Sequence, residues 1–354
     1  MKQIVCLSYE PWSNEPGRTQ HLMTRLKDAQ VLWFQPAEGP FDRRWRERGQ
    51  KVRTHVTVYT LPPERTHHLP WKDAGAVCKR QGLFIAEKLR RHRFRECLVW
   101  CTSPEQVNLL EYFEYTRLIY DCHRDWPHFP IEWESELTLQ SDVVFAASEP
   151  LAEYLSPCSR NVTLLPNGVN YALFAQEYQP VNAPAFCFVG TLYPDTDLSP
   201  LLYAAREKPE WQFTLVGGIE DDGPKALRHL ERLPNVRLLG RRPPLDIPEL
   251  LSHASVCLNF LRTSGADAGI FPIRLYEYLA TGKPIVSMLW PEQVETLADV
   301  VYGAHSEREF LRTCENALQE AAGFVTQRRR EYAAGADWRL RAAQVQNILD
   351  AITS

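Results

Sequence analysis

The sequence predicts an α/β protein with two Rossmann-like domains, each built on a parallel sheet. Short runs rich in β-branched and aromatic residues alternate with longer segments of helical period, which is typical of parallel sheets. A polar segment with two prolines, Gln176–Pro184, interrupts this alternation, and the same pattern restarts after it. The length of 354 residues exceeds what one ordinary core needs and suits two domains.

The first domain is expected over residues 1–175. Its expected strands are Gln3–Leu7, Val31–Phe34, Val56–Tyr59, Cys97–Trp100, Arg117–Asp121, Val143–Ala146 and Thr163–Leu165. Helical segments between them include Thr19–Lys27, Ala74–Arg91 and Pro104–Tyr115. Since each helical segment connects two strands, the strands are expected to run parallel.

The second domain is expected over residues 186–325, followed by a helical tail over 326–354. Its expected strands are Phe186–Val189, Phe213–Val216, Val236–Leu239, Val256–Phe260 and Pro284–Ser287. The helices between them are Leu198–Lys208, Pro224–Arg232, Ile247–His253 and Pro272–Thr281. The two halves therefore repeat one type of architecture without a recognisable repeat in sequence.

Composition and net charge exclude several classes of protein. Hydrophobic residues make up 44% and charged residues 24% of the chain, an ordinary globular balance. No apolar run reaches the roughly 18 residues of a membrane helix, and the N-terminus lacks the apolar stretch of a signal peptide. The net charge of −4 gives no indication of a nucleic-acid partner. The nine cysteines are scattered, so free thiols and a cytoplasmic location are expected.

Basic residues gather in the first hundred positions, which carry 19 Lys and Arg against 10 Asp and Glu. Two runs, residues 43–53 and 88–95, hold much of this excess and are interleaved with aromatic or apolar residues. One interpretation is a pair of solvated surfaces. The other is a peripheral contact with anionic lipid heads or a lipid-linked pyrophosphate on the inner face of the membrane.

The helix Pro272–Thr281 carries the most informative side chains. Pro272 suits a first helical position, and Gly282 followed by Pro284 suits a stop. Arg274 and Glu277 are three residues apart, so they share one face near the helix N-terminus. There, Arg274 could hold a diphosphate and Glu277 two ribose hydroxyls. The alternative is a surface ion pair worth under about 1 kcal/mol.

This helix and several other segments together resemble the GT-B fold glycosyltransferases of family 4, including their teichuronic-acid-type relatives. No single segment is specific, whereas their order and spacing are. The segments are Gly17–His21, Ile119–Asp125, Ser141–Ser148, Leu165–Asn170 with Phe174, Val189–Leu192, Val236–Arg241 and Phe271–Ser287. The resemblance implies two Rossmann-like domains facing each other across a cleft, with a nucleotide sugar held there and a terminal helix that packs back on the first domain.

By this resemblance, Glu277 binds the ribose, Gly240 and Arg241 mark the loop at the nucleotide base, and Gly17 marks a loop near the donor phosphates. The full expected donor site is Gly17, Arg18, Gly190, Gly240, Arg241, Asp267, Arg274, Leu275, Tyr276 and Glu277. The donor is a nucleoside-diphosphate sugar and the acceptor a carbohydrate or lipid-linked hydroxyl. No separate cofactor is expected.

Two departures from the family pattern affect the donor site. Many relatives carry a glutamate eight positions before the ribose-binding one, and here that position is Gly269, so Asp267 is the expected substitute. The loop Thr191–Asp197 lacks the cations that relatives place on the diphosphate. Arg274 would then hold the diphosphate, aided by Arg18, Arg262 or Arg241.

The resemblance implies transfer with retention of anomeric configuration and without a metal ion, the leaving phosphate helping to deprotonate the acceptor. His123 and Asp125 follow an expected strand and are the candidate catalytic residues, as a pair that orients a hydroxyl or acts as a base. The alternative is a turn cluster before Pro127. Asp195-Thr196-Asp197 matches the D-x-D pattern of metal-binding motifs. It follows the first strand of the second domain, however, where relatives contact phosphate, so no metal is expected.

Three other functions compete with glycosyl transfer. A nicotinamide enzyme is disfavoured because Met1–Arg18 contains no G-x-G-x-x-G and Gly217-Gly218 has no third glycine at the right spacing. A sugar-nucleotide epimerase of the same two-domain fold stays open. So does a degenerate member that binds a nucleotide sugar or a partner protein without catalysis, an alternative suggested by the two departures.

Overall fold

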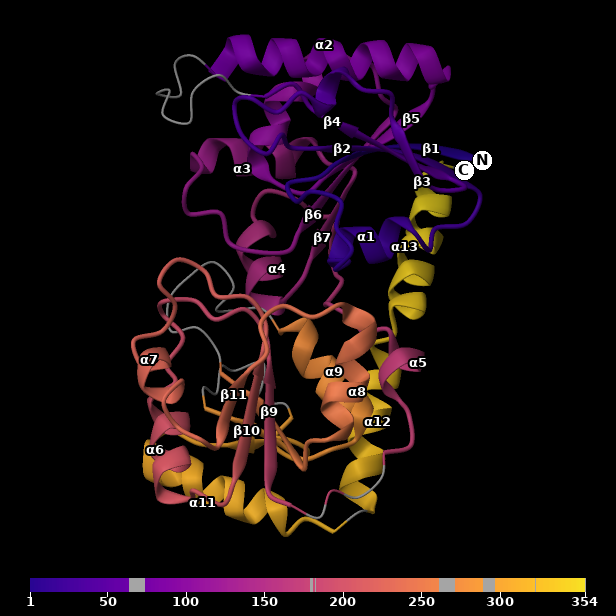
Figure 1. The fold of residues 1–354 in the computed structure, drawn as a ribbon. Coiled ribbons are helices and arrows are strands. Elements are labelled where there is room, and N and C mark those ends of the chain that lie inside the picture. Colours follow the sequence, from indigo (N-terminus) through magenta and orange to yellow (C-terminus); the bar gives the residue numbers. More distant parts are fainter. Residues whose placement is uncertain are drawn as a thin grey trace. The chain divides into compact units, whose positions relative to one another are not determined.

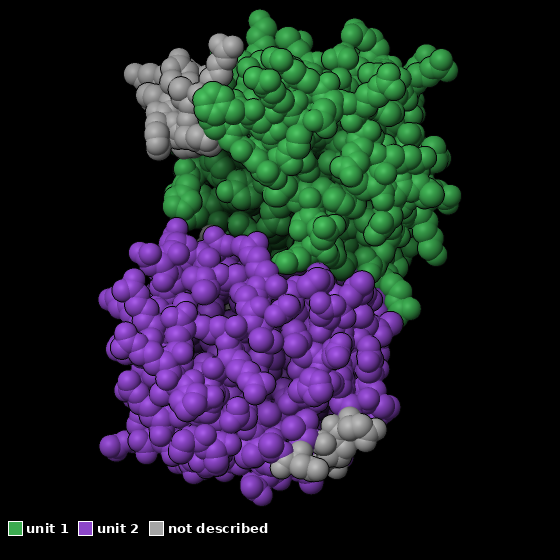
Figure 2. Space-filling model, in the orientation of Figure 1, with its two compact units in different colours: residues 1–166, 339–354 green, residues 167–338 purple. Residues whose placement is uncertain are grey.

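The computed structural model describes residues 1–63, 74–178, 181, 183–260, 271–288, 297–321 and 323–353. The chain divides into two compact units (Figure 2). The first consists of residues 1–166 together with 339–354, and the second of residues 167–338. Each unit is built on its own sheet, so the predicted α/β architecture with two parallel-sheet domains is confirmed.

The first sheet has the order β3-β4-β2-β1-β5-β6-β7-β8. Its strands are β1 (Lys2–Leu7), β2 (Ala29–Gln35), β3 (Gln50–Arg53), β4 (Val56–Thr60), β5 (Cys97–Cys101), β6 (Arg117–Cys122), β7 (Val143–Ala146) and β8 (Val162–Leu164). Strand pairs are parallel except for β3 with β4. The chain reverses its direction across the sheet between β1 and β5, which is where open parallel sheets bind ligands at their carboxyl ends.

Helical segments cover this sheet (Figure 1). They are α1 (Arg18–Met23), α2 (Ala74–His92), α3 (Ile131–Gln140), α4 (Glu149–Leu155) and the 3₁₀ segments η1 (Arg44–Arg46) and η3 (Pro104–Tyr112). Local signals place the N-termini. Ser103 and Gln106 form a capping box at η3, and the Ser148 hydroxyl accepts from Leu151 N–H at α4. The predicted helix 104–115 is thus a shorter 3₁₀ segment.

The second sheet is parallel, with the order β11-β10-β9-β12-β13-β14. Its strands are β9 (Ala185–Val189), β10 (Gln212–Val216), β11 (Val236–Leu238), β12 (Val256–Asn259), β13 (Ile285–Ser287) and β14 (Tyr302–Gly303). Its helices are α5 (Tyr171–Phe174), α6 (Ser199–Glu207), α7 (Leu227–Leu230), α8 (Ile247–Ser252), α9 (Ile273–Thr281), α11 (Glu307–Leu318) and α12 (Phe324–Gly335), with the 3₁₀ segment η4 (Pro244–Asp246). The chain reverses direction here between β9 and β12.

Alternation along the strands gives the second sheet a core on each face. Phe186 and Phe188 point into one apolar cluster, and Cys187 and Val189 point into the other. The first cluster takes residues from α6, α7 and α11, and the second from α8, α9 and α12. Both faces are therefore covered by helices, as a parallel sheet requires.

The last helix, α13 (Trp338–Thr353), belongs almost entirely to the first unit (Figure 1). Lys2 forms an ion pair with Asp350, Lys27 N–H donates to Gln346 Oε1, and Arg117 Nε donates to the carbonyl of Ile352 at 2.8 Å. The helix thus runs beside β1 and β6 at their amino ends, although it is the last element of the chain.

The unit boundaries differ from the sequence-based ones at both junctions. Residues 167–175, assigned to the first domain, group with the second, because Val169 N–H donates to Ala336 O at 2.9 Å and Phe174 lies in the second core. Residues 326–338 also stay with the second unit, where α12 packs on α9. Of the expected terminal segment, only residues from Arg339 onward join the first unit.

Candidate functional site

Three glycines end three neighbouring strands of the second sheet at its carboxyl edge. Gly190 follows β9, Gly217 follows β10, and Gly240 lies just beyond β11. Backbone bonds connect them, since Gly190 N–H donates to Val216 O at 2.8 Å and Gly217 N–H donates to Gly240 O at 2.9 Å. We refer to Gly190, Gly217 and Gly240 as the glycine row.

The backbone of the glycine row requires glycine at two of its positions. Gly217 has φ +147°, and a Cβ atom there would lie 1.8 Å from the carbonyl oxygen of Gly190. Gly240 has φ +65°, in the left-handed region, with open space where a Cβ would stand. The row therefore leaves the edge of the sheet without side chains, so that the flat part of a ligand can approach the backbone closely.

Helix α9 lies beside the glycine row because one of its side chains is bonded to β9. The buried Tyr278 hydroxyl accepts a hydrogen bond from Val189 N–H at 2.7 Å, one residue before Gly190. Gly282, with φ +77°, ends the helix as predicted. Leu275, expected at the donor site, is instead fully buried in the core, and its N–H donates to Pro272 O.

The other face of α9 presents Arg274 and Glu277. Their side chains form an ion pair at 2.5 Å and are 34% and 12% exposed. Burial raises the pKa of Glu277, and the neighbouring Arg274 opposes this shift. The pair is thus partly desolvated but still open to solvent. Tyr276, one position before Glu277, packs its ring on Phe271 with centroids 4.3 Å apart.

Arg241 lies over the turn that follows β10. Its guanidinium donates to Glu220 Oε1 at 2.6 Å and is 63% exposed, and a Cβ on Gly218 would lie 2.5 Å from Arg241 Nε. The loop after β9 holds Asp197, whose Oδ1 accepts from Ser199 N–H at the start of α6. Gly269, Asp267 and Arg262 lie outside the described residues.

In the first unit, the expected donor residue Arg18 is buried against Asp121. Arg18 Nη2 donates to Asp121 Oδ1 at 2.8 Å, Nε donates to the same carboxylate, and the side chains are 3% and 0% exposed. Asp121 lies near the carboxyl end of β6, and Gly17 precedes Arg18. The charge of Arg18 is therefore offset within the fold rather than presented to a phosphate, which differs from the expectation.

The ring of His123 is held in one tautomer. Its Nδ1 lies 3.2 Å from the backbone oxygen of Asp121, and since a carbonyl oxygen only accepts, Nδ1 carries the proton. Nε2 is then the unprotonated nitrogen. Burial lowers the pKa of His123, opposed by Asp121 and reinforced by Arg124, so the neutral form is favoured. The other candidate catalytic residue, Asp125, is exposed.

Sequence reasoning missed an aromatic and charged cluster beside His123. Tyr9 follows β1 and packs against Trp126 with ring centroids 4.8 Å apart, and His123 stands edge-on to Trp126 at 5.9 Å. Arg124 Nη2 donates to Glu10 Oε1 at 3.1 Å. Both loops follow strands that meet at one sheet edge, so their positions alone could have indicated this cluster.

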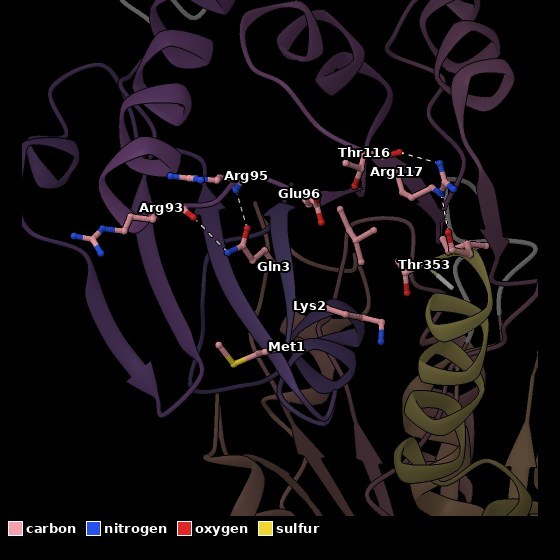
Figure 3. Close-up of a pocket in the computed structure, with 11 residues that line it drawn as sticks. Met1, Lys2, Gln3, Arg93, Arg95, Glu96, Thr116, Arg117 and Thr353 are labelled. Atoms are coloured by element: carbon pink, nitrogen blue, oxygen red, sulfur yellow. Dashed lines mark hydrogen bonds between the residues drawn. The ribbon is translucent and has the colours of Figure 1, made fainter.

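A pocket of about 810 Å³ lies at the opposite edge of the first sheet (Figure 3). It opens at the amino ends of β1, β5 and β6 and is lined in part by Lys2, Arg93, Arg95 and Arg117. The Gln3 amide donates to Arg93 O, and Arg95 N–H donates to Gln3 Oε1. In Figure 3 the guanidinium groups of Arg93 and Arg95 extend away from Lys2. Because ligands of parallel sheets bind at the carboxyl ends, this pocket is not the candidate site.

No three His, Cys, Asp or Glu side chains in the described part of the chain are grouped so that they could hold a metal ion. None of its helices combines the length and apolar character that a membrane crossing needs.

Comparison with known proteins gives a consistent result for family and fold. Residues 183–334 match the family model described as glycosyl transferases group 1. The chain is 27% identical over 359 residues to a protein of Bacillus subtilis (strain 168) named as a teichuronic acid biosynthesis glycosyltransferase, TuaH, covering 92% of this chain and 90% of that one.

Solved structures with the same fold cover nearly the whole chain. Sucrose-phosphate synthase from Thermosynechococcus elongatus has a TM-score of 0.76 at 15% identity, covering 100% of this chain and 99% of that one. Anabaena Alr3699/HepE, in complex with UDP-glucose, has a TM-score of 0.71 at 17% identity, covering 99% and 100%. Both likenesses concern the fold. Residues 183–334 are therefore similar to glycosyl transferases group 1, in a chain with the two-domain GT-B fold of these solved structures.

Proposed function

We propose that this protein transfers a sugar from a nucleoside-diphosphate sugar to a hydroxyl of a carbohydrate or lipid-linked acceptor, in the synthesis of cell-surface polysaccharide. The observation that carries the proposal is the Arg274–Glu277 pair on α9, fixed beside the glycine row by Tyr278. The similarity to a protein named for teichuronic acid biosynthesis supports a polysaccharide product. A similar structure in complex with UDP-glucose supports a nucleotide-sugar donor.

The donor would lie along the carboxyl edge of the second sheet. Its flat groups would approach the glycine row, while Glu277 accepts hydrogen bonds from the ribose hydroxyls. Arg274 would turn from Glu277 to the diphosphate, where two negative charges develop as the glycosidic bond breaks. The N-terminus of α9 points a positive dipole end in the same direction. Arg241, at the turn beside Gly218, would pack on the base.

On the acceptor side, His123 would orient the attacking hydroxyl through its unprotonated Nε2. In the proposed reaction, the bond from the anomeric carbon to the diphosphate oxygen breaks, and a bond from that carbon to the acceptor oxygen forms on the same face. The proton of the acceptor hydroxyl passes to the departing diphosphate. Retention then follows without a metal ion. Asp125, exposed in the same loop, would contact the acceptor.

The donor site is tested by thermal shift with UDP, GDP, ADP, CMP and dTDP and their common sugars. A ligand that binds the native state stabilises it by about 2.7 kcal/mol at a hundredfold excess over Kd. We expect a shift with one of these nucleotides that is lost in Glu277→Ala. The matched control is Glu331→Ala, which removes another glutamate paired with an arginine three residues earlier, at 3.7 Å. Equal shifts in both variants would remove Glu277 from the site.

A transfer assay separates catalysis from binding. With the donor found by thermal shift, we expect a glycoside product whose anomeric configuration, read by NMR, matches that of the donor, and turnover that persists in EDTA. Binding without turnover over a range of acceptors would instead favour the degenerate, non-catalytic alternative. Release of an isomerised nucleotide sugar would favour the epimerase.

We also infer that the basic segment 43–53 contacts anionic lipid heads, because an apolar side chain stands exposed beside it. Phe41 is 90% exposed, and the Arg46 guanidinium lies 5.0 Å from the ring centre of Trp45. Arg44 is already paired with Asp42 and Glu38. The exposed cations of the segment are Lys51 and Arg53 together with three arginines closer to Phe41, namely Arg43, Arg46 and Arg48. Neutralising these three should weaken binding to anionic vesicles, whereas Arg44→Gln should change it less. Unchanged binding of the triple variant would remove the inference.

A further inference from the structure

The loops after β1 and β6 bring an aromatic pair and an ion pair to one place. Tyr9, 40% exposed, packs its ring edge against Trp126. Its backbone N–H donates to Thr102 Oγ1 at 2.8 Å, which fixes it at the end of the sheet. Glu10 and Arg124 pair at 3.1 Å, with 47% and 28% of their side chains exposed. We call these four residues, Tyr9, Glu10, Arg124 and Trp126, the ring platform.

Further contacts hold the ring platform in place. The Arg124 guanidinium lies 5.8 Å from the ring centre of Tyr9 and 5.6 Å from that of Trp126. The ring of Trp126 also packs against that of Phe129, with centroids 5.8 Å apart, and Phe129 packs on Trp133 at the start of α3. These contacts hold the ring platform in place. It combines exposed aromatic carbon with hydrogen-bonding groups at its rim, which is the composition of small-ligand sites.

Each arginine near the ring platform already forms an ion pair with a carboxylate. The groups that act on His123 include two arginines, of which Arg18 is paired with Asp121 and Arg124 with Glu10. Asp125, exposed in the same loop, adds a negative charge. An anionic ligand would meet the negative charges of Glu10, Asp121 and Asp125 and would compete with Glu10 for Arg124. A neutral ligand would meet Glu10 as an acceptor and Arg124 as a donor without disturbing either pair.

A sugar ring suits this surface. One face of a pyranose is lined by C–H groups that pack on an aromatic ring, while hydroxyls at its edge both donate and accept hydrogen bonds. His123 stands edge-on to Trp126, so a hydroxyl of a ring packed there would lie beside the imidazole. We propose that the ring platform binds a neutral sugar ring of the acceptor and disfavours phosphorylated or acidic sugars. This inference rests on the proposed glycosyl transfer.

The test measures binding of methyl hexopyranosides and of hexose 6-phosphates to the full-length protein by saturation-transfer NMR, which detects weak ligands. Tyr9→Ala and Trp126→Leu should each weaken binding of the neutral glycosides roughly tenfold, the effect of losing about 1.4 kcal/mol. Tyr9→Phe, which keeps the ring, should bind as the unaltered protein does. Phe324→Ala is the matched control, since Phe324 is an 84% exposed aromatic residue of the second unit.

A charge variant tests the selectivity separately. Glu10→Gln leaves Arg124 without its carboxylate, so hexose 6-phosphates should gain affinity roughly tenfold while neutral glycosides change little. Tighter binding of phosphorylated than of neutral sugars by the unaltered protein would overturn the proposal. So would neutral binding that is unchanged in both Tyr9→Ala and Trp126→Leu.

Donor binding, measured by thermal shift on the same samples, distinguishes failure of the ring platform from failure of the proposed glycosyl transfer. If a nucleotide diphosphate still stabilises Tyr9→Ala while the glycosides bind it as tightly as before, the ring platform is wrong and the glycosyltransferase proposal stands. If no nucleotide stabilises the unaltered protein and no glycoside binds, both fail. A Tyr9→Ala variant with a normal melting temperature shows that its effect is local.

Discussion

Each unit carries an arginine–carboxylate pair at or beside the ligand edge of its sheet, and the two pairs differ in burial. Arg18 and Asp121 are 3% and 0% exposed, and two guanidinium nitrogens of Arg18 donate to the carboxylate. Arg274 and Glu277 are 34% and 12% exposed, and these two residues lie on adjacent turns of one short helix. The same two chemical groups therefore occur in very different surroundings.

The difference shows which pair a ligand can use. Separating Arg18 from Asp121 would leave two unpaired charges in a dry interior, which costs several kcal/mol. Separating Arg274 from Glu277 costs about 1 kcal/mol, because Arg274 is one-third exposed and water reaches this side of the pair. The first pair is thus part of the fold, whereas in the proposed function the second would be exchanged for contacts with a ribose and a diphosphate.

The largest expected effect is on stability, from Arg18→Met. The variant leaves the carboxylate of Asp121 buried without its counter-charge, so the free energy of unfolding of the first unit should fall by about 3–5 kcal/mol. Urea unfolding followed by tryptophan fluorescence measures this, since Trp33 and Trp100 are buried in that unit.

The matched control for Arg18→Met is the double variant Arg18→Met with Asp121→Leu. It removes both charges and should recover much of the lost stability, because no unpaired charge remains. If the single variant lost less than about 1 kcal/mol, the pair would behave as an exposed one, and the contrast with Arg274–Glu277 would disappear.

Arg274→Met should affect activity much more than stability, the reverse of Arg18→Met. Its stability should change by about 1 kcal/mol or less, while kcat/KM for glycosyl transfer should fall about 100-fold, as expected when one donor to a developing charge is removed. Steady-state kinetics on folded samples measure the loss. Arg328→Met is the control, because Arg328 pairs with Glu331 at the same spacing on α12. A similar loss in Arg328→Met would point to a general effect of helix charge.

The sequence predicted the strands of both sheets well where they are apolar on both faces. Strand β5 is buried along its whole length, and its expected and observed ranges differ by one residue. Strand β3 was missed because Gln50-Lys51-Val52-Arg53 is polar and lies exposed at the sheet edge, so that only its pairing with β4 defines it. Helix α3 also lacked a strong signal, since its charged and apolar residues are mixed around the helix.

The candidate site was predictable on α9 and much less so elsewhere. Arg274 and Glu277 share a helix face because of local spacing, which the sequence contains. The partner of Arg18 lies 103 positions away and becomes a neighbour only when β6 joins the sheet. Tyr9 and Trp126 come together in the same way. Nothing in local periodicity distinguishes a buried arginine from one that faces a ligand.

Two glycines of the glycine row give a smaller, graded effect. Gly217→Ala should lower the free energy of unfolding of the second unit by about 2–3 kcal/mol, because its Cβ would press on the Gly190 carbonyl oxygen. Gly240→Ala should cost about 1 kcal/mol, since only its positive φ is unfavourable and no atom lies within 4 Å of the added carbon. Chemical unfolding of both variants measures the difference.

Equal losses in Gly217→Ala and Gly240→Ala would contradict the close approach at Gly217. Nucleotide thermal shifts on the same variants add a second result. Gly240→Ala places a methyl group on the bare sheet edge, so its nucleotide shift should shrink more than its small loss of stability accounts for.

The smallest expected effect is the pH dependence that His123 gives to activity. Burial lowers the pKa of His123 below the ordinary histidine value of about 6.5. Because the neutral imidazole is the form that orients the hydroxyl, the acidic limb of kcat/KM should lie below pH 6.5. The folded protein binds this proton less readily than the unfolded chain, so the contribution of His123 to stability is complete above about pH 6.5 and is lost as the pH falls through the lower folded value.

Activity and stability then separate His123 from His21, another histidine whose pKa is lowered by burial. Burial lowers the pKa of His21 to about 4, so its protonation also destabilises the fold at acid pH. His21 lies outside the proposed chemistry, so His123→Gln should remove the acidic limb of kcat/KM yet leave the acid destabilisation due to His21. His128→Gln, an exposed histidine of the same loop, should leave both profiles unchanged. An acidic limb that persists unmoved in His123→Gln would assign the titration to another group and leave His123 as a support for the Trp126 ring.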